Sequence, residues 1–182
     1  GSIFKNAQLN SLIEITNVLK NLIEENFDIQ CFFYLPKTQK RIFESSFARH
    51  QNINIKEHNL NENEYFSKIS KSNLLLLASN FDDDSINYYK YSWPAKLGSY
   101  LMSKVPIFIY GPNKIYFIND AKKKKWAYVE NEQSLLKLKN SIKKILYDEN
   151  IRKQTLKYAI KKSKDFELQQ IQKKLEKIFG NT

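Results

Sequence analysis

Glycine, cysteine and histidine are scarce in this 182-residue chain, and each scarcity excludes a class of site. Only Gly98 and Gly111 lie away from the chain ends, too few for a glycine-rich phosphate loop. The single cysteine, Cys31, excludes an internal disulfide and a cysteine-rich zinc site. The two histidines, His50 and His58, leave little for metal chemistry, so the sequence predicts no metal and no other cofactor.

Long apolar runs are also missing. The longest cover residues 74–78 and 105–110 and are far too short to span a bilayer. No signal peptide is visible, so we expect a cytoplasmic protein. Hydrophobic residues nevertheless make up 42% of the chain, which is enough for a core, and the length suits one domain.

Basic residues outnumber acidic ones, and their distribution is uneven. The formal net charge is +11, of which +1 lies in residues 1–120 and +10 in residues 121–182. The basic segment contains the run Lys122 to Lys125, followed by Lys143, Lys144, Lys161, Lys162, Lys164, Lys173, Lys174 and Lys177. Such a surface can attract anionic lipid at the inner face of the cell membrane, or it is simply a solvated helical face. We expect no nucleic-acid partner, because no recognition motif is present.

Strand-like and helix-like segments alternate along the chain. The predicted strands are 28–35, 53–55, 74–78, 106–110 and 126–129, and a polar loop is predicted over 79–93. The predicted helices are 9–27, 38–48 capped by Thr38, 61–70 capped by Asn61, 94–104 starting at Pro94, 133–147, 149–164 and 166–179.

This alternation, with fully apolar central strands, predicts a parallel sheet covered on both faces. We therefore expect a Rossmann-like α/β domain over residues 3–164, followed by a basic helix over 165–182. Residues 1–2 resemble a cloning remnant. Ligands of such sheets bind beyond the carboxyl ends of the strands, which places the candidate site in the loops after residues 34, 55, 78 and 110 and near Pro94.

The segment 91–107 carries the most informative chemistry. A helix that starts near Pro94 would point free N–H groups at an anion, and Lys96 would add a positive charge. Ser99 and Tyr100 follow one turn later and can bond to hydroxyl groups. This combination suits a diphosphate with an attached ribose. The alternative is that Lys96 is an ordinary solvated lysine.

The pattern Pro94-x-Lys96-Leu97-x-x-Tyr100-Leu101, with Pro106 after four further residues, resembles a known segment. It is similar to the donor-binding segment of glycosyltransferases that have two facing Rossmann domains, the GT-B fold, of the group 1 or family 4-like type. The segments Trp126 to Glu130 and Asp148 to Gln154 also resemble family segments. The similarity covers residues 5–179 in element order.

The resemblance implies that this chain is the C-terminal domain, which binds a UDP- or GDP-sugar. Lys96 would then contact the diphosphate or sugar and act as the catalytic residue, by stabilising the charge of the leaving group. The implied donor-binding residues are Ser79 near the sugar, Pro94 and Lys96, Ser99 at the ribose, Tyr100 supporting that turn, and His58 and Asn59 near the base. Ser99 departs from the pattern, because the family usually has glutamate there.

The same resemblance implies that the N-terminal acceptor domain is missing, so this chain alone would not turn over. Its implied role is transfer of a sugar to a glycan or lipid-linked acceptor, in bacterial surface polysaccharide synthesis. The alternative is a non-catalytic or degenerate Rossmann-like module whose basic surface contacts nucleic acid or membrane.

A competing signal is Asp82-x-Asp84 after an apolar strand. In the GT-A fold, an Asp-x-Asp motif holds a divalent metal on the donor diphosphate. That motif directly follows its strand, whereas residues 78–81 intervene here. We interpret Asp82 and Asp84 as part of a solvated acidic turn.

Overall fold

The computed structural model describes residues 2–167, 172 and 176, and its strands are all parallel to their neighbours. The strands are β1 (Cys31–Leu35), β2 (Ile53–Glu57), β3 (Leu75–Ala78), β4 (Ile107–Tyr110) and β5 (Tyr128–Glu130). They form two sheets, β1-β2 and β3-β4-β5, and no ladder joins β1 to β3 within the described residues. The predicted Rossmann-like α/β class is confirmed, with the strands divided between two sheets.

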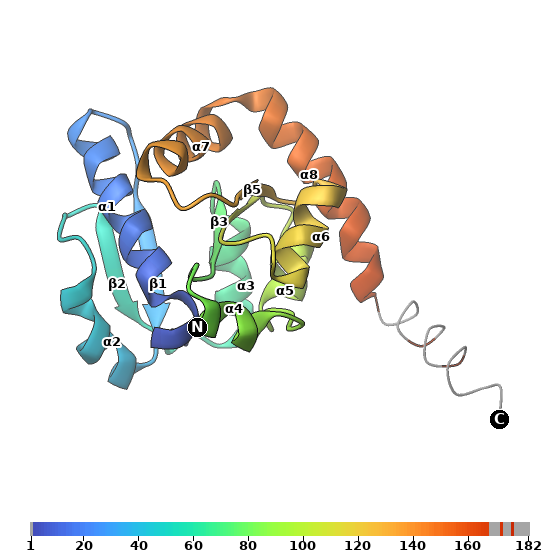
Figure 1. Ribbon diagram of the computed structural model, residues 1–182, viewed down its shortest axis with the longest axis horizontal. Coiled ribbons are helices and arrows are strands. Elements are labelled where there is room, and N and C mark those ends of the chain that lie inside the picture. Colours follow the sequence, from blue (N-terminus) through green and yellow to red (C-terminus); the bar gives the residue numbers. More distant parts are fainter. Residues whose placement is uncertain (1, 168–171, 173–175, 177–182) are drawn as a thin grey trace.

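Helices alternate with these strands and surround them (Figure 1). The helices are α1 (Asn10–Glu24), α2 (Lys37–Phe43), α3 (Glu62–Ser70), α4 (Asp83–Tyr89), α5 (Leu97–Met102), α6 (Tyr116–Lys124), α7 (Leu135–Tyr147) and α8 (Glu149–Ser163). Three short helical segments are η1 (Lys5–Leu9), η2 (Glu44–Ser46) and η3 (Lys164–Phe166). No helix in the described part of the chain is long and apolar enough to cross a membrane.

Helix α1 joins the two sheets. Its apolar face packs into one hydrophobic cluster with Phe33 of β1 and Phe108 of β4, and α7 completes that cluster. The Ser11 hydroxyl donates to the Ser79 carbonyl just after β3 (2.9 Å), and Tyr110 at the end of β4 donates to Glu14 (2.5 Å). Side-chain packing therefore holds together sheets that share no backbone ladder.

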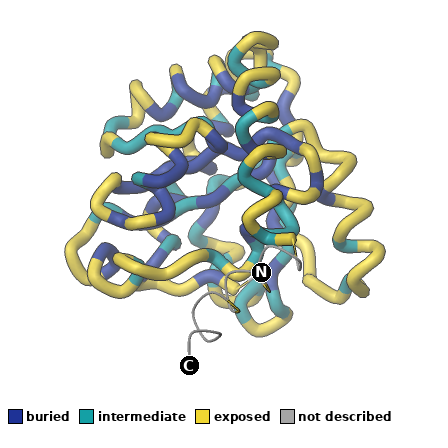
Figure 2. Tube along the Cα trace, turned by 90° about the vertical axis from the view of Figure 1, so that its right-hand side faces the viewer, coloured by how far each residue is buried: buried dark blue, intermediate teal, exposed yellow. Residues whose placement is uncertain are grey.

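A second cluster packs mainly around the three-stranded sheet and includes side chains from α5, α6 and α8. Buried positions gather on the inner strands, and exposed positions follow the outer loops (Figure 2). The largest fully buried side chain is Trp126, whose indole Nε1 donates to Asp120 (2.8 Å). Lys124 and Lys162 neutralise that buried carboxylate at 2.6 and 3.3 Å, so its burial is compensated.

Several predicted boundaries are wrong, for local reasons. The loop predicted over 79–93 contains α4, because the Asp82 side chain accepts a hydrogen bond from the Ser85 N–H (2.9 Å) and caps a helix there. Helix α6 was missed entirely. Helix α2 begins at Lys37, after Pro36 at its N-cap, and ends at Phe43, so Thr38 is not its cap. The predicted capping box of Asn61 and Glu64 is confirmed.

Helix α5 is shorter than predicted and starts later. The Pro94 carbonyl accepts from the Leu97 N–H (2.9 Å), so residues 94–97 form a turn and the helix runs from Leu97 to Met102. Lys104 then adopts a left-handed conformation (φ 58°), which ends the helical path. Of the basic helix predicted over 165–182, all but residues 165–167, 172 and 176 lie outside the described residues.

Candidate functional site

Lys96 is a half-buried cation without a carboxylate partner. It occupies the N-cap position of α5, and in the described part of the chain no acidic side chain forms an ion pair with it. Burial lowers the pKa of its ammonium group. Its Nζ lies 5.9 Å from the centre of the Tyr100 ring, at the outer limit of a cation–π contact. A bound anion would relieve the cost of burying this charge.

Ser99 and Tyr100 continue the site along α5. The Ser99 hydroxyl donates to the Lys96 carbonyl (2.9 Å) and lies 3.1 Å from the hydroxyl of Tyr65, in α3. Burial, with a smaller contribution from nearby Tyr65, raises the pKa of the Tyr100 phenol, so this group stays neutral. Lys96 at the N-cap and Ser99 and Tyr100 in α5 therefore supply one cation and two neutral hydroxyl groups within one short segment.

His58 and Asn59 approach from the two-stranded sheet. The His58 N–H donates to the Leu35 carbonyl (2.7 Å), which extends the pairing of β1 and β2 by one bond. Its ring lies 6.3 Å from that of Tyr65, and both His58 and Asn59 are exposed. Tyr65 thus contacts His58 on one side and Ser99 on the other, and it connects predicted residues from two parts of the chain.

The sequence reasoning missed Tyr65. It is the fourth residue of α3, one turn after the capping box at Asn61. That box was predicted, and it fixes where the helix begins. A helix that leads away from the carboxyl end of β2 has its first turn at the ligand edge of the sheet. The capping box thus indicates that Tyr65 lies at this edge, but its contact with Ser99 depends on how α3 packs against α5.

Ser79 is buried against the backbone of neighbouring segments. It is fully buried after β3, its N–H donates to the Tyr110 carbonyl (2.9 Å), and its hydroxyl lies 3.4 Å from the Ala7 carbonyl in η1. Its place at a strand end agrees with the sequence, but its role near a sugar stays a prediction. Gly111 explains the tight packing here, since a Cβ at that position would lie 2.8 Å from Ile118 and 3.0 Å from the Ser79 carbonyl.

The carboxyl end of β4 carries a buried polar contact that the sequence did not indicate. Tyr110 is fully buried, and burial together with its hydrogen bond to Glu14 raises the pKa of its phenol. The other oxygen of Glu14 accepts from the Gln133 side chain, just before α7 (2.9 Å). These contacts fix α1 and the start of α7 over the strand ends.

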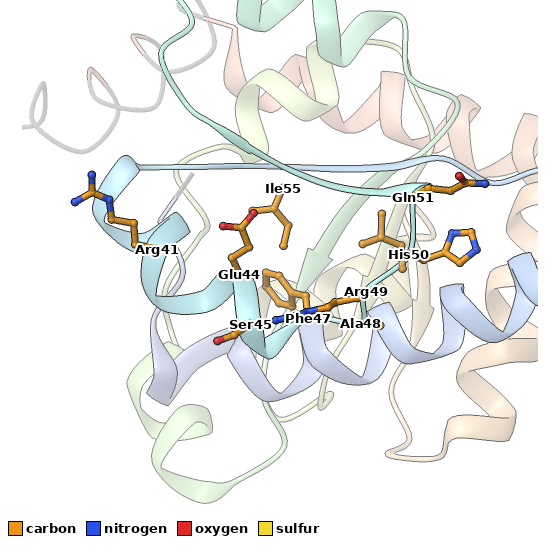
Figure 3. A pocket seen from close by; sticks show the side chains of 10 residues that line it. Arg41, Glu44, Ser45, Phe47, Ala48, Arg49, His50, Gln51 and Ile55 are labelled. Carbon is orange, nitrogen blue, oxygen red and sulfur yellow. The ribbon is translucent and has the colours of Figure 1, made fainter.

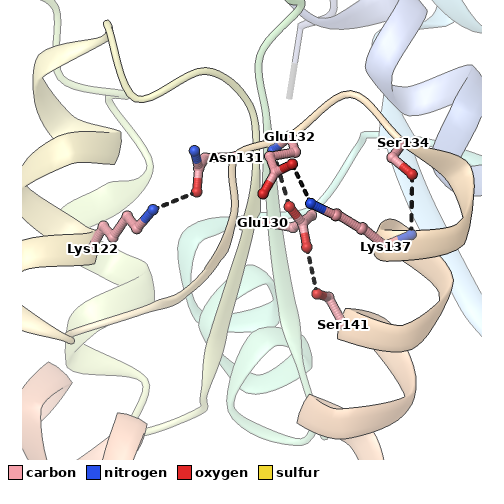
Figure 4. A network of polar contacts seen from close by, with 7 residues as sticks. All are labelled: Lys122, Glu130, Asn131, Glu132, Ser134, Lys137 and Ser141. Atoms are coloured by element: carbon pink, nitrogen blue, oxygen red, sulfur yellow. Dashed lines mark hydrogen bonds and ion pairs between the residues drawn. The ribbon is translucent and has the colours of Figure 1, made fainter.

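The loop after β5 is held by a polar network (Figure 4). Glu130 accepts from the Glu132 N–H (2.9 Å) and from the Ser141 hydroxyl in α7 (2.7 Å). Lys137 forms an ion pair with Glu132, and Lys122 donates to the Asn131 side chain (2.7 Å). Two lysines of the basic segment therefore have local structural partners.

Asp82 serves the protein's own backbone. Both of its oxygens accept from Ser85, at 2.9 Å from the backbone N–H and 2.8 Å from the hydroxyl. These hydrogen bonds, the backbone one first, lower the pKa of the carboxyl group. Among the described residues, no group of three or more metal-binding side chains lies together.

The larger of two open pockets lies elsewhere (Figure 3). It has a volume of about 720 Å³ and is lined by residues of α2, η2, β2 and the loop between η2 and β2, among them Arg41, Phe47, His50 and Ile55. The smaller pocket, of about 510 Å³, is lined by Lys104, Arg152 and their neighbours. Neither of these two pockets includes a predicted donor-binding residue.

No protein-family model and no curated protein matches this chain. Among solved structures, it is similar to an α,α-trehalose-phosphate synthase (UDP-forming) from Burkholderia vietnamiensis, with a TM-score of 0.69 and 10% identity. The match covers 98% of this chain and 43% of that one, so the chain spans less than half the length of that protein. At this identity the likeness shows the fold alone, and the fold agrees with one Rossmann-like half of a GT-B fold.

Proposed function

We propose that this chain is the donor-binding, C-terminal half of a GT-B glycosyltransferase, and that it binds the nucleoside diphosphate of a sugar donor. The observation that carries the proposal is Lys96, a half-buried cation without a carboxylate partner among the described residues. The Lys96 carbonyl accepts from the Ser99 hydroxyl, which lies 3.1 Å from the Tyr65 hydroxyl, and the His58 ring lies 6.3 Å from that of Tyr65. A diphosphate with an attached ribose supplies the matching groups in the same order.

Lys96 would act through charge. When the bond between the sugar and the diphosphate breaks, negative charge grows on the leaving oxygen. A cation already held in a partly desolvated position stabilises that charge more than it stabilises the uncleaved donor. In this mechanism the protein needs no metal ligand for the diphosphate, which agrees with the use of Asp82 as a helix cap.

The wider setting of the proposal comes from the sequence. The acceptor-binding half would be a second Rossmann-like domain outside this chain, and the cleft between the halves would be the active site. The acceptor would be a glycan or a lipid-linked glycan in bacterial surface polysaccharide synthesis, at the cytoplasmic face of the membrane. The solved structure that the chain resembles is more than twice its length, which supports a two-domain enzyme.

Contact with an anionic membrane is proposed for the remaining basic surface. Lys124 and Lys162 neutralise Asp120, and Lys122 binds Asn131, so these three are partly used within the fold. Lys173, Lys174 and Lys177 lie outside the described residues. Sedimentation with phosphatidylserine vesicles, compared with phosphatidylcholine vesicles, tests the contact, and equal binding to both would contradict it.

The donor site is tested by titrating the chain with UDP, GDP and their sugars in a calorimeter. We expect Lys96→Ala to weaken UDP binding about 10- to 100-fold, the range for a hydrogen bond to a charged group. Lys153→Ala is the control of matched charge, because Lys153 is exposed on α8, where it pairs with Glu149. No binding by the wild-type chain at millimolar nucleotide, or unchanged affinity in Lys96→Ala, would overturn the proposal.

The rival function is a degenerate domain that has lost donor binding and serves as an interaction module. The Ser99 hydroxyl favours it to some extent, because its proton is already donated to the Lys96 carbonyl. Salt-sensitive binding of RNA or vesicles without nucleotide-sugar binding would support that function. Recovery of donor affinity in Ser99→Glu would indicate a decayed donor site.

A further inference from the structure

The hydrogen bond between Tyr65 and Ser99 has a definite direction. A serine hydroxyl has one proton, and Ser99 gives it to the Lys96 carbonyl (2.9 Å). In the 3.1 Å contact with Ser99, Tyr65 must therefore be the donor. The phenol oxygen of Tyr65 keeps its lone pairs free to accept, whereas Ser99 has used its proton and one acceptor position.

Tyr65 also has the right position to face a ligand. It is half-buried in the first turn of α3, near the exposed ring of His58 and hydrogen-bonded to Ser99 of α5. Its ring is fixed from both sides, because its hydroxyl is hydrogen-bonded and its face approaches His58. An acceptor linked through Ser99 to the backbone of Lys96, a cation without an ion-pair partner among the described residues, is suited to hold a sugar hydroxyl while the cation holds a phosphate.

We propose that Tyr65 is the residue that recognises the ribose of the bound nucleotide, by accepting a hydrogen bond from a ribose hydroxyl while it donates to Ser99. The inference rests on the proposed donor site. It assigns ribose recognition to Tyr65 instead of Ser99. Ser99 then acts as a positioning residue, because it orients the Tyr65 hydroxyl. Tyr65 is a specificity residue, because it distinguishes a ribonucleotide from a nucleotide without ribose hydroxyls.

The test compares UDP with its 2′,3′-dideoxy analogue, which keeps the base and the diphosphate. We expect the wild-type chain to prefer UDP, and Tyr65→Phe to lose about 5- to 10-fold in affinity for UDP with little change for the analogue. This is the loss expected for one neutral hydrogen bond. Phenylalanine keeps the ring beside His58, so only the oxygen is removed. Tyr147→Phe, on exposed Tyr147 at the end of α7, is the matched control.

A second variant separates the two hydroxyl groups. Ser99→Ala removes the acceptor that orients Tyr65 but leaves the Tyr65 oxygen in place, so we expect it to reduce the preference for UDP less than Tyr65→Phe does. Thermal melts of both variants check that they fold. Equal losses for UDP and its analogue, or an unchanged preference in Tyr65→Phe, would overturn the role of Tyr65 while leaving the donor site intact. Absence of any nucleotide binding by the wild-type chain would overturn both proposals.

Discussion

The two sheets of this domain differ in burial, and each contributes a different part of the candidate site. In β4 all four residues are buried, and Ile107, Ile109 and Tyr110 have no exposed surface. In β1, by contrast, Phe32 is 45% exposed, and no strand borders the outer edge of β2 among the described residues. The cation Lys96 belongs to the well-buried half, and His58 lies at the end of the exposed one. The molecule thus places Lys96 in the more buried half and His58 in the more exposed one.

The largest expected difference in stability between the two sheets comes from substituting one isoleucine in a strand of each. Ile109 is fully buried in β4, whereas Ile55 in β2 is only partly buried. We expect Ile109→Ala to reduce the free energy of unfolding by about 4 kcal/mol and Ile55→Ala by about 1–2 kcal/mol, because a cavity costs most where the surroundings are packed on every side. Urea unfolding measures both. Equal losses would contradict the comparison.

The next effect concerns the buried carboxylate of the three-stranded half. Removing Asp120 leaves the Trp126 N–H without its acceptor, whereas Lys162 keeps its ion pair with Asp165, so we expect Asp120→Ala to cost about 2 kcal/mol. Glu149→Ala is the control, because its ion pair with Lys153 is exposed and a change within about 0.5 kcal/mol is expected. A similar cost for both variants would show that the Asp120 contacts add nothing to stability.

Lowering the pH should reduce the stability of the protein through the Asp120 carboxylate. Burial alone would raise the pKa of Asp120, but hydrogen bonds from Lys124 and Trp126 and the charge of Lys162 outweigh it and hold that pKa below the ordinary value. Its contribution to the free energy of unfolding is therefore complete at pH values above the unfolded-state pKa of about 3.9. That contribution disappears as the pH falls through the lower pKa of the folded state. Stability curves from pH 7 to pH 2 should show this loss in the wild type and not in Asp120→Ala.

The smallest effect compares two helix caps. Asp82→Ala on α4 and Asn61→Ala on α3 should each cost about 1 kcal/mol at pH 7. The hydrogen bonds from Ser85 lower the pKa of Asp82. The contribution of this cap to stability is therefore present above pH 3.9, roughly the unfolded-state pKa, and is lost as the pH falls through the pKa of the folded state. The Asn61 amide does not titrate. Equal acid sensitivity of the two variants would contradict this assignment.

Much of the fold could be predicted, because strong local signals fix the elements. The apolar run at 74–78 and the capping box at Asn61 predict β3 and α3 closely. The sequence does not predict helix α4, because Asp82 and Asp84 are interpreted there as a solvated acidic turn, whereas Asp82 caps the helix. Helix α6 was missed because its first turn carries no acidic residue and its N-cap side chain makes no capping bond.

The candidate site was less predictable, because it depends on contacts between distant segments. Lys96 and Ser99 could be singled out by their spacing within one short segment. Whether a carboxylate neutralises Lys96, and which hydroxyl faces the ligand, depends on how α3 packs against α5. The link from Tyr65 to Ser99 spans 34 residues, and no local pattern in the sequence announces it.

The separation of the two sheets also bears on how the domain opens. Backbone ladders transmit cooperativity between strands, and none connects β1 to β3 within the described residues. The amides of β1 and β2 should therefore exchange with solvent through a partial opening that leaves β3, β4 and β5 intact, so the protein would contain two cooperative units joined through α1. A nucleotide that contacts both His58 and Lys96 would tie these units together, and its binding would slow amide exchange at the far strand β2 as well as at α5.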